Sequence, residues 1–119
     1  MSYLRIIIRG LRIVATTAIS GGLVIFSRLL RPLAPVQAQV LRNRAYRFWA
    51  RDFCRCLGMR VRVRGPRPAD PFFLVCNHVS YTDIPRIASQ VDTAFVAKAD
   101  LRGWPLVGHA FQAADTIFI

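Results

Sequence analysis

The order of apolar and polar residues divides the chain into a helical first half and a second half in which strands and helices alternate. Arginines recur at helical spacing in an apolar background over residues 4–13, and fifteen uncharged residues follow at 13–27. This pattern predicts one long amphipathic helix that becomes fully apolar. A second helix is predicted from residue 36 to residue 57, because Gly58 supplies a C-terminal stop.

Beyond Gly58 the pattern changes to short segments with the character of strands. Alternating or continuous apolar runs predict strands at 59–64, 72–76, 94–98 and 116–119, and short helices are predicted at 84–89 and within 103–108. The first strand is expected to be half exposed, and the second and third are expected to be buried. The order strand, helix, strand, helix, strand predicts an α/β layered domain with its polar loops at the carboxyl ends of strands.

The apolar part of the first helix bears on membrane association. Fifteen residues at about 1.5 Å each reach roughly 22 Å, less than the ~30 Å hydrocarbon core of a bilayer. We therefore expect residues 13–27 to lie in one leaflet or re-enter, unless snorkelling arginines at both ends extend the helix. Gly21 and Gly22 predict a bend in its middle. A cleaved signal peptide is the alternative, although no convincing small-residue cleavage site precedes Arg28.

The charge of the chain is strongly positive: it has 17 Lys and Arg residues and only six Asp and Glu residues, for a net charge of +11. A chain with this charge is expected to bind a polyanion, either nucleic acid or an anionic membrane surface. The arginines form one stripe on each predicted helix: Arg5, Arg9 and Arg12 on the first, and Arg44, Arg47, Arg51 and Arg55 on the second. Apolar and aromatic residues opposite these stripes favour helices at the lipid headgroups. A solvated face on a packed helix is the alternative. Nothing else resembles a nucleic-acid module, so anionic lipids are the expected partner and nucleic acid is not.

A polar loop after the predicted strand 72–76 carries two residues suited to acid–base chemistry. His78 stands five residues before Asp83. An imidazole can accept a proton near neutral pH, and a carboxylate at its other ring nitrogen fixes the tautomer and stabilises the cation. The spacing is consistent with a general base and its orienting group. Two interpretations compete with it: Asp83 could be the N-cap of the helix at 84–89, and His78 could be an ordinary hydrogen-bonded loop histidine.

Two blocks in this part of the chain match a known family. The run NHVSYTD, residues 77–83, resembles the N-H-x-S-x-x-D block of the glycerolipid acyltransferases. Residues 95–119 resemble the F-V-A-K-x-E-L-x-x-x-P-x-x-G block of the same family and the strand that follows it. The likeness is to bacterial 1-acyl-sn-glycerol-3-phosphate acyltransferases, also called lysophosphatidate acyltransferases, and it covers about the last third of the chain.

The resemblance implies a reaction and roles for five residues. His78 would take the proton from the sn-2 hydroxyl of lysophosphatidate as that oxygen attacks an acyl thioester on coenzyme A or acyl carrier protein, and Asp83 would orient His78. Asn77 and Ser80 match the block and are expected to shape the substrate loop, unless each is only a turn residue. Lys98 matches the lysine of the second block and is expected near the acceptor phosphate, unless it is an ordinary strand-end lysine.

The resemblance also implies where the protein works and what it uses. The product would be phosphatidate, made at the cell inner membrane with the catalytic part facing the cytoplasm. The acyl-CoA or acyl carrier protein is a co-substrate, and no cofactor or metal is expected. Cys54, Cys56 and Cys76 lack the further Cys or His ligands of a zinc site and are expected to be reduced thiols.

The sequence departs from the family pattern in several places. Tyr81 replaces the more usual tryptophan or phenylalanine, Asp100 replaces glutamate, and Asp115 stands where many members have glycine. An arginine after the last strand, the F-P-E-G-T-R block that binds the acceptor phosphate and a later proline-containing block are not found in these 119 residues. We therefore expect a membrane-associated basic helical segment at 1–58 and an incomplete α/β acyltransferase domain at 59–119, inactive alone.

Two other functions stay open at this point. Related acyltransferases that use other lysolipids share the histidine block, so the acceptor could differ from lysophosphatidate. A non-catalytic basic protein that binds membranes or nucleic acid would also account for the arginine stripes, with the likeness at residues 77–83 carrying no activity.

Overall fold

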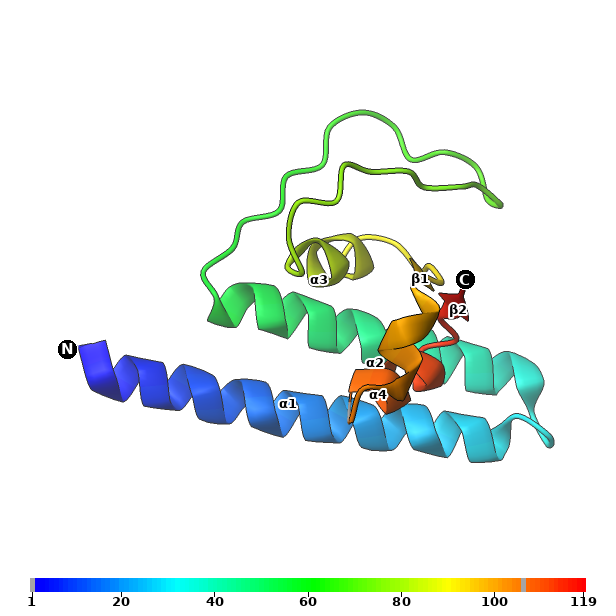
Figure 1. Cartoon of the computed structure of the whole chain (residues 1–119), viewed down its shortest axis with the longest axis horizontal. Coiled ribbons are helices and arrows are strands. Elements are labelled where there is room, and N and C mark those ends of the chain that lie inside the picture. Colours follow the sequence, from blue (N-terminus) through cyan, green and yellow to red (C-terminus); the bar gives the residue numbers. More distant parts are fainter. Residues whose placement is uncertain (1, 106) are drawn as a thin grey trace.

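The structure, a computed structural model, describes residues 2–105 and 107–119. Two long helices, α1 (Ser2–Leu30) and α2 (Pro35–Cys56), lie side by side as an antiparallel hairpin (Figure 1). α2 begins with a proline. Proline lacks a backbone N–H, and at the first position of a helix that N–H would have no acceptor within the helix, so nothing is lost there. Gly58 has a φ of +71° and follows the last turn of α2, where the Met59 N–H donates to the Cys54 carbonyl at 2.8 Å. The predicted glycine stop is therefore confirmed.

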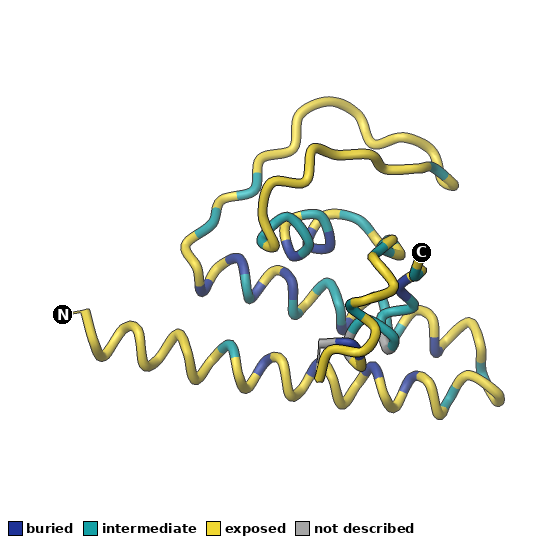
Figure 2. Tube along the Cα trace, in the orientation of Figure 1, coloured by how far each residue is buried: buried dark blue, intermediate teal, exposed yellow. Residues whose placement is uncertain are grey.

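Small side chains fill the buried positions of the helical hairpin. The buried residues of α1 are Thr16, Ser20, Val24 and Ser27, and those of α2 include Ala38, Ala45 and Ala50. Small residues at these positions let two helix backbones approach closely. Most large apolar residues of α1 are exposed rather than packed between α1 and α2, and Figure 2 shows most of α1 as exposed. An apolar outer surface of this kind suits contact with lipid.

The first helix is longer than its uncharged stretch. α1 has 29 residues, which at about 1.5 Å per residue exceeds the ~30 Å thickness of the hydrocarbon core. By length and composition it could cross a bilayer. Residues 13–27 were expected to be too short to cross a bilayer because only these residues are uncharged. The helix is longer than this stretch, since it continues through arginines at both ends. It also runs through Gly21 and Gly22 without interruption.

The remaining elements are short and pack on the hairpin. α3 (Asp83–Ala88) lies against α2, and α4 (Val107–Ala113) contacts α1 and the 3-10 helix η1 (Ala99–Gly103). β1 (Val96–Ala97) pairs in parallel with β2 (Ile117–Phe118), with Val96 opposite Ile117 and Ala97 opposite Phe118. The strands predicted at 94–98 and 116–119 are present in shortened form, but Val96 is 60% exposed rather than buried.

Two predicted strands are absent from the part of the chain that the structure describes. Residues 59–64 and 72–76 are extended chain without strand pairing, and among the described residues no backbone–backbone hydrogen bond involves residues 60–79. Phe73 and Val75 are 101% and 91% exposed, and Cys76 is exposed as well. The prediction of a buried central strand was wrong here because a strand needs a neighbouring backbone, and this segment loops away from the helices (Figure 1). The described fold is mostly helical with one small parallel sheet.

Candidate active site

The loop of residues 77–83 joins the extended segment to α3. Its turn is closed by the Asp83 N–H, which donates to the Ser80 carbonyl at 3.0 Å. α3 then begins at Asp83, after Thr82 at the N-cap position, and its buried residues Pro85 and Ala88 pack on the hairpin. The loop is therefore held at the start of a docked helix even though the chain before it is unpaired.

His78 and Asp83 meet within this loop. The His78 Nδ1 atom lies 3.2 Å from Asp83 Oδ2, and the backbone N–H groups of Val79 and Ser80 each donate to the same oxygen at 2.9 Å. The His78 side chain is 58% exposed, whereas the Asp83 side chain is only 17% exposed. One carboxylate oxygen thus holds both the imidazole and the turn that carries it.

The surroundings of Asp83 keep its carboxyl group ionised. Hydrogen bonds from the Ser80 and Val79 N–H groups, and to a smaller extent the contact with His78, lower the pKa of Asp83. A carboxylate can only accept hydrogen bonds, so the proton of the neutral imidazole belongs on Nδ1. His78 then carries its free lone pair on Nε2. The arrangement can therefore accept a proton at Nε2 and stabilise the resulting imidazolium.

The capping interpretation of Asp83 does not describe what the carboxylate does. Thr82 occupies the N-cap position of α3, without a side-chain cap, and Asp83 Oδ2 bonds backward to Val79 and Ser80 rather than forward into the helix. A further charged neighbour is Arg86, whose Nη1 lies 3.6 Å from Asp83 Oδ1. Sequence reasoning missed Arg86, although its i, i+3 spacing from Asp83 at a helix start was a usable signal.

Three further residues were expected to bind substrate, and only one of them has a defined contact in the loop. Ser80 Oγ accepts hydrogen bonds from the Thr82 backbone N–H at 3.3 Å and from Thr82 Oγ1 at 3.1 Å, so it shapes the turn. Asn77 is exposed immediately before His78, and Lys98 is exposed just after β1. Within residues 2–105 and 107–119, neither Asn77 nor Lys98 makes a hydrogen bond or ion pair with the His78–Asp83 pair. Their roles in binding stay predictions.

Some arginines of the two stripes bind other parts of the fold. The guanidinium of Arg12 pairs with Asp52, a buried carboxylate of α2. Arg47 Nη2 lies 2.7 Å from Asp92 Oδ1, and Arg51 Nε donates to the Ser89 carbonyl at 3.2 Å. These three arginines therefore have partners within the fold. The exposed members of the stripes are Arg5, Arg9, Arg12, Arg44, Arg51 and Arg55, whereas Arg47 is half-buried.

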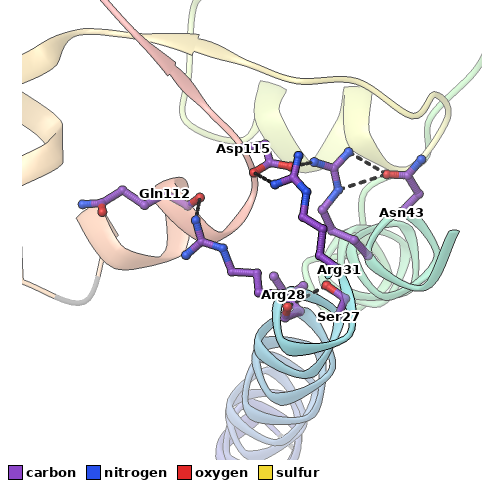
Figure 3. Close-up of polar contacts among 8 residues, drawn as sticks. Ser27, Arg28, Arg31, Asn43, Gln112 and Asp115 are labelled. Atoms are coloured by element: carbon purple, nitrogen blue, oxygen red, sulfur yellow. Dashed lines mark hydrogen bonds and ion pairs between the residues drawn. The ribbon is translucent and has the colours of Figure 1, made fainter. Parts of the chain in front are cut away.

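A second cluster of arginines lies where the hairpin turns. Figure 3 shows Arg31 and Asp115 facing each other, at 3.9 Å between Nη1 and Oδ1, while Arg28 Nη2 donates to the Gln112 carbonyl at 3.2 Å. Arg42 also forms an ion pair with Asp115. Asp115 has a φ of +54°, a left-handed conformation that favours glycine, which fits the glycine expected there from the family pattern. This cluster ties α4 and β2 to the hairpin.

Metal-binding side chains do not gather in the described part of the chain. Among residues 2–105 and 107–119, no group of three or more His, Cys, Asp or Glu side chains could hold a metal ion. Cys54 and Cys56 are buried in α2, and burial raises the pKa of both thiols.

Known proteins resemble the chain along its whole length. A family model described as Acyltransferase matches residues 60–119. A lyso-ornithine lipid O-acyltransferase of Pseudomonas aeruginosa is 37% identical over the whole chain and 46% of that protein. A protein of the same description from Rhizobium meliloti is 37% identical over 86% of the chain and 37% of its own length.

A relative of a second description matches a shorter part of the chain. A 1-acyl-sn-glycerol-3-phosphate acyltransferase of Neisseria meningitidis is 34% identical over 66% of the chain and 31% of that protein. The chain thus spans less than half the length of these curated relatives. No solved structure matches it.

Proposed function

Because this chain belongs to the acyltransferase family, we propose that it is the part of a lysolipid acyltransferase that carries the catalytic base. The observation that carries the proposal is the contact between His78 Nδ1 and Asp83 Oδ2 at 3.2 Å, inside the segment that the family match covers. This pair has the chemistry that transfer of an acyl group to a hydroxyl requires.

The proposed reaction moves one proton and one acyl group. His78 Nε2 takes the proton of the lysolipid hydroxyl while the hydroxyl oxygen attacks the carbonyl carbon of an acyl thioester. The carbon–sulfur bond breaks, and the imidazolium returns the proton to the departing thiolate. Asp83 stabilises the imidazolium between these steps, and no acyl-enzyme is formed. Base catalysis of this kind contributes about 10²–10⁴-fold, and positioning of the two substrates supplies more.

Lyso-ornithine lipid is the acceptor that we favour. The relatives described as lyso-ornithine lipid O-acyltransferases in Pseudomonas aeruginosa and Rhizobium meliloti match over 119 and 109 residues, which include much of the helical hairpin. The Neisseria meningitidis 1-acyl-sn-glycerol-3-phosphate acyltransferase matches over 80 residues. Similarity in the hairpin supports a shared lipid acceptor, since these helices are the elements suited to contact the bilayer. Lysophosphatidate, with phosphatidate as the product, is the second candidate.

We also propose an acyl donor and a location for the protein. We take the donor to be acyl-CoA or acyl carrier protein, both water-soluble carriers of the acyl thioester, with no further cofactor. α1 would anchor the protein in the cell inner membrane, with the loop of His78 on the cytoplasmic side where these carriers are found. The exposed arginines Arg5, Arg9, Arg44 and Arg55 would contact anionic lipid headgroups.

A panel of acceptors tests the proposal. The full-length protein, reconstituted in phosphatidylglycerol-containing vesicles, is incubated with acyl-CoA or acyl carrier protein and either lyso-ornithine lipid, lysophosphatidate or another lysolipid. Mass spectrometry of the lipids should show acylated ornithine lipid above a His78→Ala control. Phosphatidate alone would support the second acceptor. Absence of any acylated product from all acceptors with both donors would contradict the proposed function.

A further inference from the structure

A row of arginines lies on the extended segment that leads to the catalytic loop. Arg60, Arg62 and Arg64 are exposed, and within residues 2–105 and 107–119 none of the three makes a side-chain hydrogen bond or an ion pair. Alternate side chains of an extended chain lie on the same side, at intervals of about 6.7 Å. Pairing of this backbone with another strand would leave the arginines on that side. No acidic residue occurs in the sequence between Asp52 and Asp70, so the charge of the row is not offset nearby along the chain.

The row lies on the side of the molecule that faces away from α1. α1 packs on α2 and α2 packs on α3, and the segment that follows Gly58 runs past α3 on the side opposite α1 (Figure 1). The exposed large apolar residues that suit contact with lipid are concentrated on α1. With α1 in the membrane, the width of α2, about 10 Å, separates the bilayer from the start of this segment. The arginine row therefore belongs to the water-facing side.

The spacing of the arginine row suits the carboxylates of a helix. Residues i and i+4 of a helix are about 6 Å apart along its axis, close to the interval of about 6.7 Å between the arginines. A pyrophosphate, such as that of acyl-CoA, is compact and is best bound by donors that converge on it. The three arginines are instead spread along about 13 Å of extended chain. The row fits an acidic protein surface better than it fits a nucleotide.

We propose that Arg60, Arg62 and Arg64 dock an acidic helix of the protein that carries the acyl thioester, an inference that rests on the proposed function. Of the two donors in that proposal, the inference selects acyl carrier protein over acyl-CoA. The segment leads into the loop of His78, so a carrier bound here delivers its thioester to that loop from the water side. Attraction between opposite charges speeds the encounter of the two proteins and is weakened by salt.

The test removes the charge of the row or keeps it, in the full-length protein. Arg60→Gln/Arg62→Gln/Arg64→Gln removes the charge, and Arg60→Lys/Arg62→Lys/Arg64→Lys keeps it. Thiol release is measured at low salt in vesicles that contain lyso-ornithine lipid, with the same acyl group on acyl carrier protein or on coenzyme A. The glutamine variant should raise KM for the protein donor by roughly tenfold, as expected for the loss of three exposed ion pairs. Its kcat, and its KM for acyl-CoA, should stay near wild type, and the lysine variant should restore most of the lost affinity.

A neighbouring ion pair provides the matched control. Arg67 Nη2 lies 3.3 Å from Asp70 Oδ2, and both side chains are largely exposed on the same extended segment. Arg67→Gln/Asp70→Asn alters this segment without changing its net charge. KM for both donors should therefore stay near wild type in this variant.

Several results would overturn the inference. An unchanged KM for acyl carrier protein in the glutamine variant, or an equal rise for both donors, would show that the row is no docking surface for the carrier. Loss of vesicle binding with unchanged KM for the donor would make the row a lipid-binding surface. Wild-type turnover of acyl-CoA but not of acyl carrier protein would refute this inference and leave the proposed function standing. Absence of lysolipid-dependent thiol release from either donor would refute both.

Discussion

Among the single residues of the candidate site, Asp83 matters most, because one of its carboxylate oxygens holds both the loop backbone and the His78 side chain in place. This oxygen accepts from the Val79 and Ser80 N–H groups and lies within hydrogen-bonding distance of His78. The five-residue spacing was enough to predict that His78 and Asp83 meet. It could not predict that the loop's own backbone donates to the same oxygen, because that depends on how the turn folds. The exposed Asn77 and Lys98 illustrate the same limit, since a motif match does not fix a contact.

Asp83→Asn in the full-length protein should lower kcat by roughly 10²–10⁴-fold, the range typical of general-base catalysis. The amide can accept the two backbone hydrogen bonds, but it carries no charge to stabilise the imidazolium or fix its tautomer. Helix content by circular dichroism should be unchanged, since Asp83 does not cap α3. Turnover near the wild-type value would remove Asp83 from the mechanism.

The carboxyl group of Asp83 should stay ionised to a lower pH than an ordinary aspartate. Its pKa should lie below the ordinary 3.8, chiefly because of the Ser80 and Val79 N–H groups. A carboxyl group with a lowered pKa stabilises the loop above its unfolded-state pKa, and this stabilisation is lost as the pH falls through the lower folded-state pKa. Carbon-13 NMR of labelled aspartate can follow this titration. His78→Ala should retain most of the shift, whereas a return to the ordinary value in that variant would mean that the imidazole is its main cause.

At the scale of elements, α2 shows what helical spacing can and cannot predict. The spacing correctly placed four arginines on one stripe, but it could not say which element packs there. The structure divides the stripe: Arg47 and Arg51 bond to Asp92 and Ser89 beyond the end of α3, while Arg44 and Arg55 stay exposed. The ion pair between Arg47 and Asp92 is still partly open to solvent and is worth at most about 1 kcal/mol, so these contacts orient α3 more than they stabilise the fold.

The two halves of the stripe should respond differently to substitution. Arg44→Ala/Arg55→Ala should weaken binding to anionic vesicles by about 1 kcal/mol per arginine, roughly 30-fold for the pair. Arg47→Ala/Arg51→Ala should change vesicle affinity less and lower turnover more, because α3 carries Asp83. Vesicle sedimentation and acyl transfer by the full-length variants measure both effects. Equal loss of vesicle affinity in the two double variants would place all four arginines at the membrane.

In the molecule as a whole, local pattern predicted the two long helices and α3 well, but it misplaced the helices near residues 103–108, which are η1 (Ala99–Gly103) and α4 (Val107–Ala113), and predicted the sheet poorly. Both long helices, the stop at Gly58 and the short helix α3 follow from residues close together in sequence. Residues 72–76 have the composition of a buried strand, yet Phe73 and Val75 are exposed because no described strand lies beside them. Strand pairing is non-local, so alternation predicts the conformation of a segment but not the presence of its partner. An apolar cavity of about 370 Å³, lined by residues of α1, α2, α3 with its preceding loop, and α4, likewise depends on segments far apart in sequence, so no local pattern predicts it.

Replacement of His78 tests whether this residue is the base of a lysolipid acyltransferase. Acyl transfer from acyl-CoA or acyl carrier protein to a lysolipid is measured for full-length wild-type protein, His78→Ala and the matched control His109→Ala. His109 is exposed in α4 and has alanine five residues on, where His78 has Asp83. His78→Ala should lower kcat by about 10²–10⁴-fold, whereas His109→Ala should stay close to wild type. Lysolipid-dependent turnover by His78→Ala at the wild-type rate would contradict the assignment of His78 as the base.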